Sequence, residues 1–230
     1  MTPEALSQRA VRFYSRYGDE LESIRQLLHI QLDQLALAST LENGLPRKAI
    51  RVVSRTKELK NFLLKLARKG WPEFYLPTEV IHDLVGARIV CWFHDDCYAM
   101  LNLLRESQRL TILPDSIEDY NENPKPSGYR AIHVLADVTY DQVVRKGKKH
   151  EIVAGKMTCE IQIRTLFQDA WGELTHQMHY KIDQRERAKY NELVSTLADH
   201  LFVEDKAAMA IREVLKKAEP GKPRTGFKSK

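Results

Sequence analysis

The sequence predicts an α+β (mixed α/β) fold in which a five-stranded mixed β-sheet is flanked by helices, with helical extensions at both ends of the chain. Segments in which apolar and polar residues alternate are interleaved with segments in which apolar residues recur every three or four positions. A 230-residue chain with 43% hydrophobic and 29% charged residues is typical of one large globular domain with a sizeable core. No apolar run approaches the roughly 20 residues of a membrane span, so we expect no contact with a membrane.

The N-terminal extension, residues 1–48, is predicted to consist mainly of one helix. Thr2-Pro3-Glu4 is typical of a helix start because it combines a capping hydroxyl, a proline at the first helical position and an early acid. Apolar residues then recur at spacings of three and four from Phe13 to Leu35, with Gly18 as a potential break and Asn43-Gly44 as the stop. This apolar stripe belongs either to the core or to a contact between copies of the chain.

The central region, residues 49–182, is predicted to contain the sheet. Its five strands are expected at Ile50–Val53, Ala87–Phe93, Leu110–Leu113, Tyr129–Tyr140 and Thr158–Arg164. Helices are expected after Lys57, after a cap at Asp95-Asp96, and over 166–180 after a cap at Thr165. Residues 119–128 are predicted to form a polar loop and 141–156 a basic hairpin.

The C-terminal end carries the positive charge of the chain. Residues 183–218 are predicted to form a helix, and 219–230 a basic disordered tail. Between residues 206 and 230, eight Lys and Arg stand against two Glu, a local net charge of +6, although the whole chain carries only +5. Such a tail either aids solubility or contacts a polyanion such as RNA.

The cysteines and the N-terminus indicate the compartment. Cys91, Cys97 and Cys159 are odd in number and lack the close spacing of a metal site. The N-terminus lacks the apolar core of a signal peptide. Because unpaired thiols are typical of a reducing compartment, we expect a cytoplasmic protein.

Four polar clusters lie at the ends or on the faces of the predicted strands. They are Ser54–Lys57, Asp83–Arg88, Lys125–His133 and Glu160–Arg164. Together they combine two carboxylates with many cations, which is what phosphoryl chemistry requires. Carboxylate oxygens hold Mg²⁺, cations neutralise charge that develops on phosphates, and one carboxylate can accept a hydroxyl proton. Taken singly, each cluster has a structural explanation, such as a helix cap or a surface ion pair.

Taken in order, these clusters closely resemble the synthetase domain of the RelA/SpoT family, in the short single-domain form of the small alarmone synthetases. The matching residues are Ser54-Arg55-Thr56-Lys57, Ile81-His82-Asp83-Leu84-Val85-Gly86-Ala87-Arg88-Ile89, Lys125-Pro126-Ser127-Gly128-Tyr129-Arg130-Ala131-Ile132-His133 and Glu160-Ile161-Gln162-Ile163-Arg164-Thr165, followed by Ala170-Trp171, His176 and Tyr180-Lys181. The resemblance covers about residues 50–182. Neither the hydrolase domain nor the C-terminal regulatory domains of the family are recognisable.

The resemblance implies a nucleotidyltransferase-like sheet and a GTP/GDP pyrophosphokinase. Such an enzyme transfers the β,γ-pyrophosphate of ATP to the 3′-hydroxyl of GDP or GTP, making the alarmone (p)ppGpp in the stringent response. By the same resemblance Mg²⁺ is the cofactor, Asp83 binds it, and Glu160 completes the metal site or takes the acceptor proton. Arg55 and Arg88 would sandwich the adenine of ATP, and Lys57 would meet its phosphates.

The acceptor would bind beside these residues. Tyr129 would stack on the acceptor base, an interaction worth roughly 1–3 kcal/mol per base. The other residues expected at the acceptor are Lys125, Arg130, His133, Gln162, Arg164, Asp169, His176 and Lys181.

Two features leave the acceptor open. Asp169 stands where short guanosine-using relatives tend to have asparagine; its carboxylate could accept hydrogen bonds from guanine N1–H and N2–H₂, or point to solvent. Some short members of the family are toxins that modify adenine nucleotides or the 3′ end of tRNA. An RNA acceptor could contact the tail and the basic hairpin residues Arg145, Lys146, Lys148, Lys149 and His150.

Two further hypotheses concern the whole protein. An inactive nucleotide- or RNA-binding module is the alternative from another class, although a binder has little need for both carboxylates. A homo-oligomer, in particular a tetramer as in short relatives, is expected to form through the terminal helices.

Overall fold

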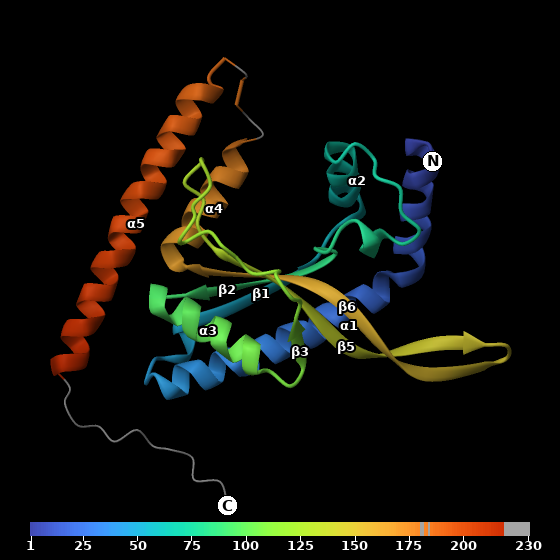
Figure 1. Ribbon diagram of the computed structural model, residues 1–230, viewed down its shortest axis with the longest axis horizontal. Coiled ribbons are helices and arrows are strands. Elements are labelled where there is room, and N and C mark those ends of the chain that lie inside the picture. Colours follow the sequence, from blue (N-terminus) through green and yellow to red (C-terminus); the bar gives the residue numbers. More distant parts are fainter. Residues whose placement is uncertain (180–181, 184, 219–230) are drawn as a thin grey trace, which may run out of the picture.

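The computed structural model describes residues 1–179, 182–183 and 185–218, and the side chains of these residues except 176–179 and 215–218. The expected tail, 219–230, lies outside the described residues. A mixed sheet occupies the middle of the molecule, with a long hairpin projecting at one end and the last helix at the other (Figure 1). No described helix has both the length and the apolar character needed to cross a membrane.

The sheet confirms the predicted α+β class. Its strands are β1 (Ile50–Thr56), β2 (Val85–Cys91), β3 (Leu110–Ile112), β4 (Glu118–Asp119), β5 (Ile132–Lys146) and β6 (Lys149–Thr165). Their order is β1-β2-β6-β5-β3, and β4 pairs with β5. Only the β2–β6 pair is parallel among these strands, which makes the sheet mixed. The sixth strand, β4, lies at the edge of the predicted polar loop, and its two residues are too few to show an alternating pattern.

The helices lie close to their predicted positions. They are α1 (Pro3–Glu42), α2 (Leu59–Arg68), α3 (His94–Glu106), α4 (Leu166–His179) and α5 (Arg187–Ala218). The Thr2 hydroxyl caps α1, which continues through Gly18 without a break. The expected cap of α3 is wrong: Phe93 is the N-cap residue, and Asp95 and Asp96 lie in the first turn, where both bind Arg212 of α5.

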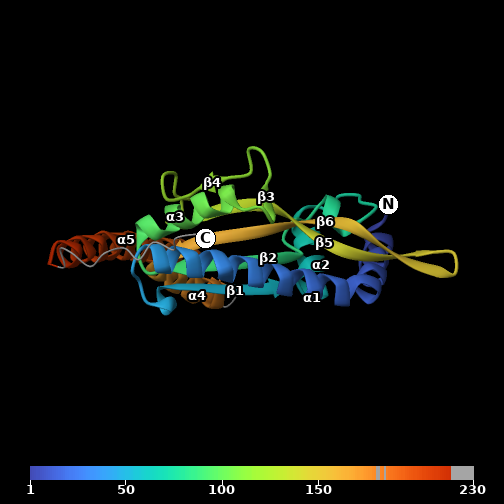
Figure 2. The same cartoon turned by 90° about the horizontal axis from the view of Figure 1, so that it is seen from below.

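The apolar stripe of α1 forms part of the core. Leu21, Ile24, Leu28 and Leu32 are at most 3% exposed, and α1 packs against β1 and β2. Figure 2 shows this helix running along most of the length of the sheet. These four residues therefore confirm the core alternative for the stripe, while an oligomer formed through the terminal helices stays a prediction. Since α1 covers one face of the sheet, polar side chains on the other face are free to form a site.

The ends of β5 differ from the prediction. Tyr129 and Ala131 were expected on the strand, but β5 begins at Ile132, so Tyr129 lies in the preceding loop. At its other end β5 continues past Tyr140 and pairs with β6 as far as Lys146 and Lys149. Gly147, with a φ of +66°, makes the tight turn between them, which favours glycine. The basic hairpin is thus a direct extension of the two central strands (Figure 1).

Candidate active site

Cross-strand pairing gathers polar side chains on the sheet face opposite α1. Gly86 of β2 pairs with Arg55 of β1 and with Glu160 of β6, and Arg88 pairs with Gln162. Because paired residues point to the same face, these side chains share one surface. They border an open pocket of about 610 Å³, whose lining includes Arg55, Asp83, Arg88, Glu160, Gln162 and Glu173.

Asp83 lies at one side of this pocket between two lysines. Its carboxylate oxygens lie 2.9 Å from Lys57 Nζ and 2.9 Å from Lys65 Nζ. Burial alone would raise the pKa of Asp83, but the two ammonium groups outweigh it and hold the pKa below its ordinary value. Asp83 is therefore ionised at neutral pH and lies in a strongly positive environment.

Lys65 was missed by the sequence reasoning. It lies on α2 at a position where a lysine usually points to solvent, and no motif pattern singled it out. The backbone bond from Lys57 N to Leu84 O (2.7 Å) brings the start of this segment against Asp83. The helix that follows can therefore reach back to the same carboxylate.

Glu160 is the second carboxylate of the pocket. Its Oε1 lies 3.4 Å from His133 Nδ1, and its Oε2 accepts a hydrogen bond of 3.0 Å from Gln162 Nε2. Burial raises the pKa of Glu160, as does the negative charge of Asp83, but the contacts with His133 and Gln162 outweigh both and lower it. The two carboxylates thus interact electrostatically while both remain charged.

Tyr129 lies in the loop before β5 and is joined to the pocket through His133 and Arg164, which contact the lining residues Glu160 and Gln162. Its hydroxyl accepts a hydrogen bond of 2.8 Å from Arg164 and forms another of 2.6 Å with His133 Nε2. Its ring lies 5.2 Å from Lys125 Nζ and 5.9 Å from the ring of Trp171. Burial raises the pKa of Tyr129 in spite of the nearby Arg164 charge, so the phenol stays neutral. Tyr129 is thus held in one orientation by its hydroxyl and its flanking rings and cations.

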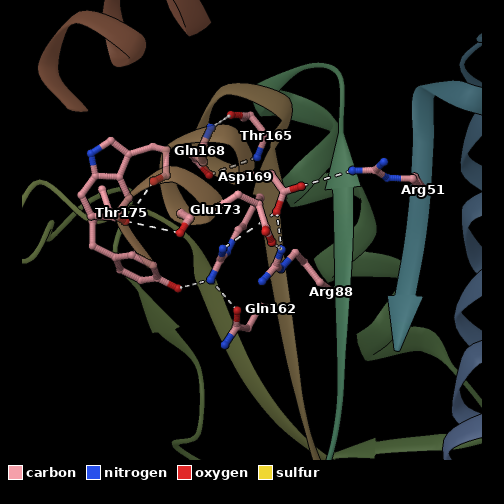
Figure 3. Close-up of polar contacts among 12 residues, drawn as sticks. Arg51, Arg88, Gln162, Thr165, Gln168, Asp169, Glu173 and Thr175 are labelled. Carbon is pink, nitrogen blue, oxygen red and sulfur yellow. Dashed lines mark hydrogen bonds and ion pairs between the residues drawn. The ribbon is translucent and has the colours of Figure 1, made fainter. Parts of the chain in front are cut away.

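Asp169 of α4 is enclosed by arginines (Figure 3). Its carboxylate is 2.7 Å from Arg88, 3.2 Å from Arg51 and 3.9 Å from Arg164. The residue is only 6% exposed, so the expectation that it could point to solvent is wrong. Arg88 also binds Glu173 at 2.7 Å. Arg51 and Glu173 were not expected in the site, although Arg51 shares a strand face with Arg55.

Three expected residues are not placed with the others. The Arg130 guanidinium donates to the carbonyl of Asn121 (3.1 Å) and lies 4.0 Å from the ring centroid of Phe202 on α5, away from the pocket lining. The side chain of His176 and the whole of Lys181 lie outside the described residues.

A family model described as a region found in RelA / SpoT proteins matches residues 54–185, more than half of the chain. Two GTP pyrophosphokinases of Bacillus subtilis (strain 168) are among the similar proteins. YwaC is 33% identical over 149 residues, covering 64% of this chain and 63% of that protein. YjbM is 34% identical over 130 residues, covering 56% of each. The aligned segments therefore span less than two thirds of either relative.

Solved structures share the fold. A GTP pyrophosphokinase family protein from Streptococcus pneumoniae superposes with a TM-score of 0.73 at 24% identity, over 89% of this chain and 95% of that one. The small alarmone synthetase 2 from Bacillus subtilis superposes with a TM-score of 0.67 at 27% identity, over 86% and 98%. The likeness covers a larger share of the chain than the segment matched by the family model.

Proposed function

The chain belongs to the RelA/SpoT family, and on that premise we propose that it transfers the β,γ-pyrophosphate of ATP to the 3′-hydroxyl of GDP or GTP. The observation that carries this proposal is the pair of ionised carboxylates, Asp83 and Glu160, which interact across a pocket rich in cations. A site that only bound a nucleotide would gain nothing from two negative charges facing its phosphates. The pair makes sense when a metal and a proton acceptor are required.

We propose that Asp83 and Glu160 hold Mg²⁺. Magnesium usually binds one or two protein carboxylates together with phosphate oxygens and water, so two hard oxygen donors fit it. No group of three or more His, Cys, Asp or Glu able to hold a metal occurs among the described residues, so phosphate oxygens and water would have to complete the site. Bound there, Mg²⁺ would neutralise charge on the transferred phosphates. Lys57 and Lys65, now paired with Asp83, would then be free to bind phosphate oxygens.

The donor nucleotide binds along β1 and β2 in this proposal. Arg55 of β1 is exposed at the pocket. Arg88 lies on β2, two residues after Gly86, which pairs with Arg55, and it is held by Asp169 and Glu173. Guanidinium planes stack well on a purine, so the two arginines can enclose the adenine. The ion pairs of Arg88 fix its plane before ATP arrives, which lowers the entropy cost of binding.

The acceptor nucleotide binds on the side of Tyr129. Its base stacks on the Tyr129 ring, and Lys125, whose ammonium lies beside that ring, meets its phosphates. Arg164, Gln162 and His133 keep the ring and Glu160 in place through their hydrogen bonds. Roles for Asp169, Arg130, His176 and Lys181 at the acceptor stay predictions.

The chemical step follows from this arrangement. The acceptor 3′-oxygen attacks the β-phosphorus of ATP, a new P–O bond forms, and the bond to the α-phosphate oxygen breaks with AMP as the leaving group. Glu160 takes the proton of the 3′-hydroxyl as the oxygen attacks. His133 lies next to Glu160, lowers the pKa of the Glu160 carboxyl and keeps that carboxylate oriented. The lysines and arginines position the two substrates and neutralise the negative charge of the phosphates.

We further propose a cytoplasmic homo-oligomer. All three cysteines are buried and unpaired, which suits a reducing compartment.

The proposed oligomer rests on α5. An apolar stripe on this helix is exposed in the single chain and would be covered by a second copy. It consists of Leu193, Leu197, Val203, Ile211 and Val214. Light scattering tests this: the wild type should exceed the 26.7 kDa of one chain, and Ile211→Glu should lower the mass.

One experiment tests the proposed reaction. The protein is incubated with γ-labelled ATP, Mg²⁺ and, separately, GDP, GTP, ADP or tRNA. We expect release of AMP together with label in guanosine tetra- or pentaphosphate. Label on tRNA or on ADP would overturn the acceptor, and no AMP with any acceptor would overturn the reaction.

A further inference from the structure

Residues 125–129, the loop that carries Tyr129 and that we call the acceptor loop, rest directly on α5, which lies outside the segment matched by the family model. Gly128, next to Tyr129, has a φ of +82°. A Cβ added to it would lie 2.4 Å from Cβ of Ala198 and 3.5 Å from Cα of Ser195. Because such a close approach between carbon atoms is not possible, the loop fits only where glycine faces a small side chain on α5.

A second contact joins α5 to the same tyrosine. Trp171 of α4 donates a hydrogen bond of 2.9 Å from its indole N–H to the carbonyl of Val194 on α5. The Trp171 ring lies 5.9 Å from the Tyr129 ring. Tyr129 is therefore connected to one turn of α5 both through its chain neighbour Gly128 and through the ring beside it.

The position of α5 is fixed by polar contacts along its length. Thr165 donates a hydrogen bond of 2.9 Å to the buried carboxylate of Asp205, and Arg212 lies 2.9 Å from the carboxylate of Asp96. The Arg130 guanidinium, which also holds the carbonyl of Asn121, covers the ring of Phe202. These contacts set the position of α5 against the end of β6, α3 and the loop, so we expect a change on α5 to be transmitted to the loop.

We propose that Ala198 and Trp171 are positioning residues that set Tyr129 for acceptor binding, so that α5 governs the affinity for the acceptor and not for ATP. This inference rests on the proposed function, in which Tyr129 stacks on the acceptor base. The donor side depends on α5 less directly: Arg55 lies on β1 and Lys57 follows that strand. Arg88 is the exception, because it is held by Asp169 and Glu173 of α4, the helix against which α5 mainly packs.

The test enlarges the side chain at the contact. Ala198→Leu adds carbon atoms where the loop backbone lies, so the loop must shift away from α5. We expect the KM for GDP to rise about 10- to 100-fold, as overpacking of a close contact predicts, while the KM for ATP stays within about twofold. Ala188→Leu, at an exposed position of the same helix, is the matched control and should leave both constants unchanged.

Two further variants keep the test decisive if Ala198→Leu does not fold. Trp171→Phe keeps an aromatic ring beside Tyr129 but removes the bond to Val194, and it should raise the KM for GDP by about 3- to 10-fold. Gly128→Ala creates the same clash from the loop side and should weaken GDP binding measured by calorimetry. Thermal unfolding of each variant checks that the fold is retained.

The outcomes separate the inference from the proposed function. Acceptor-specific loss in the folded variants supports the inference. An equal rise in both KM values, or no rise in either, overturns it. If the wild type releases no AMP with any acceptor, the proposed function fails; in that case unchanged GDP binding in Ala198→Leu overturns the inference as well, and selective loss of GDP binding upholds it.

Discussion

The proposed donor side and the proposed acceptor side of the pocket are built in different ways. The donor side consists of Arg55, Lys57, Asp83 and Arg88, which lie on or next to the paired strands β1 and β2. The acceptor side is centred on Tyr129, which lies in a loop and takes its position from α4 and α5. Backbone pairing fixes the first side, whereas side-chain packing between distant segments fixes the second.

This difference indicates which of the two nucleotide sites can change its specificity. A strand register moves only by two-residue steps if the core face is to stay buried, so the donor side tolerates little adjustment. The loop of residues 125–129 depends on a few contacts with helices. A substitution on α4 or α5 can therefore shift it while the sheet stays intact. We expect the donor to be the fixed substrate and the acceptor the adjustable one.

Glu160 belongs to both sides, and its loss should have the largest effect. Glu160→Gln keeps the shape but removes the charge and the proton acceptor, so transfer should fall by about 10²- to 10⁴-fold while ATP still binds. Production of AMP measures transfer, and calorimetry measures ATP binding. Glu151→Gln in the exposed hairpin is the control. If transfer in Glu160→Gln stays close to that of the wild type, Glu160 is not catalytic.

The acceptor side alone should respond to loss of the Tyr129 ring. Tyr129→Ala should raise the KM for GDP by about 5- to 150-fold, which corresponds to the roughly 1–3 kcal/mol of base stacking, and leave the KM for ATP unchanged. Tyr129→Phe keeps the ring and should lose much less. A comparable rise in the KM for ATP would remove the division between the two sides.

Loss of a guanidinium on the donor side should affect the KM for ATP, whereas loss of the Tyr129 ring affects the KM for GDP. Arg55→Ala should raise the KM for ATP by about 2- to 30-fold, because stacking of a guanidinium on a base contributes roughly 0.5–2 kcal/mol. Arg55→Lys should not restore it, since an ammonium has no plane to stack. The KM for GDP is measured alongside, and a larger change in that constant would assign Arg55 to the acceptor.

The last prediction concerns the stability of α5 docking and not activity. Burial raises the pKa of Asp205 from 3.8 to about 6. The folded state therefore binds this proton more tightly than the unfolded chain. The carboxylate costs stability above pH 6, and this cost disappears as the pH falls from 6 to about 4.

Asp205→Asn should remove that cost while its amide oxygen still accepts from Thr165. We expect the free energy of unfolding to rise by about 1–3 kcal/mol at pH 7.5 and to change little at pH 4.5, since each pKa unit corresponds to about 1.4 kcal/mol. Chemical denaturation at the two pH values measures this. Asp199→Asn, at an exposed position of α5, serves as the control. A gain of equal size at both pH values would contradict the role of burial.

Sequence reasoning reached the sheet because its strands show local periodicity, whereas the donor-side residues were assigned by the family resemblance and their roles stay predictions. Alternation along residues 158–164 places Glu160 and Gln162 on one face, and the structure has them on β6 facing the pocket. The helix ends at Thr2 and Thr165 followed from capping residues. In these cases the signal lies within a few residues of the element that it describes.

The rest depends on contacts between distant segments. Lys65 reaches Asp83 only because the fold brings α2 beside the segment that precedes β2. Arg130 follows Tyr129 directly, but α5 draws its guanidinium toward Phe202 and away from the pocket. The fit of Gly128 against Ala198 joins positions that share no pattern in the sequence. Residue type alone could not predict these partners.

The parallel pairing of β2 with β6 has a consequence for how the chain folds. The β5–β6 hairpin joins neighbouring segments through one tight turn, so it can close early. The contact between Gly86 and Glu160 joins segments far apart in the chain, and such long loops close slowly. A chain with only the hairpin formed thus carries Glu160 without Asp83 nearby. The two carboxylates meet only when this long-range pairing forms, so a chain that lacks the pairing also lacks the paired carboxylates of the proposed site.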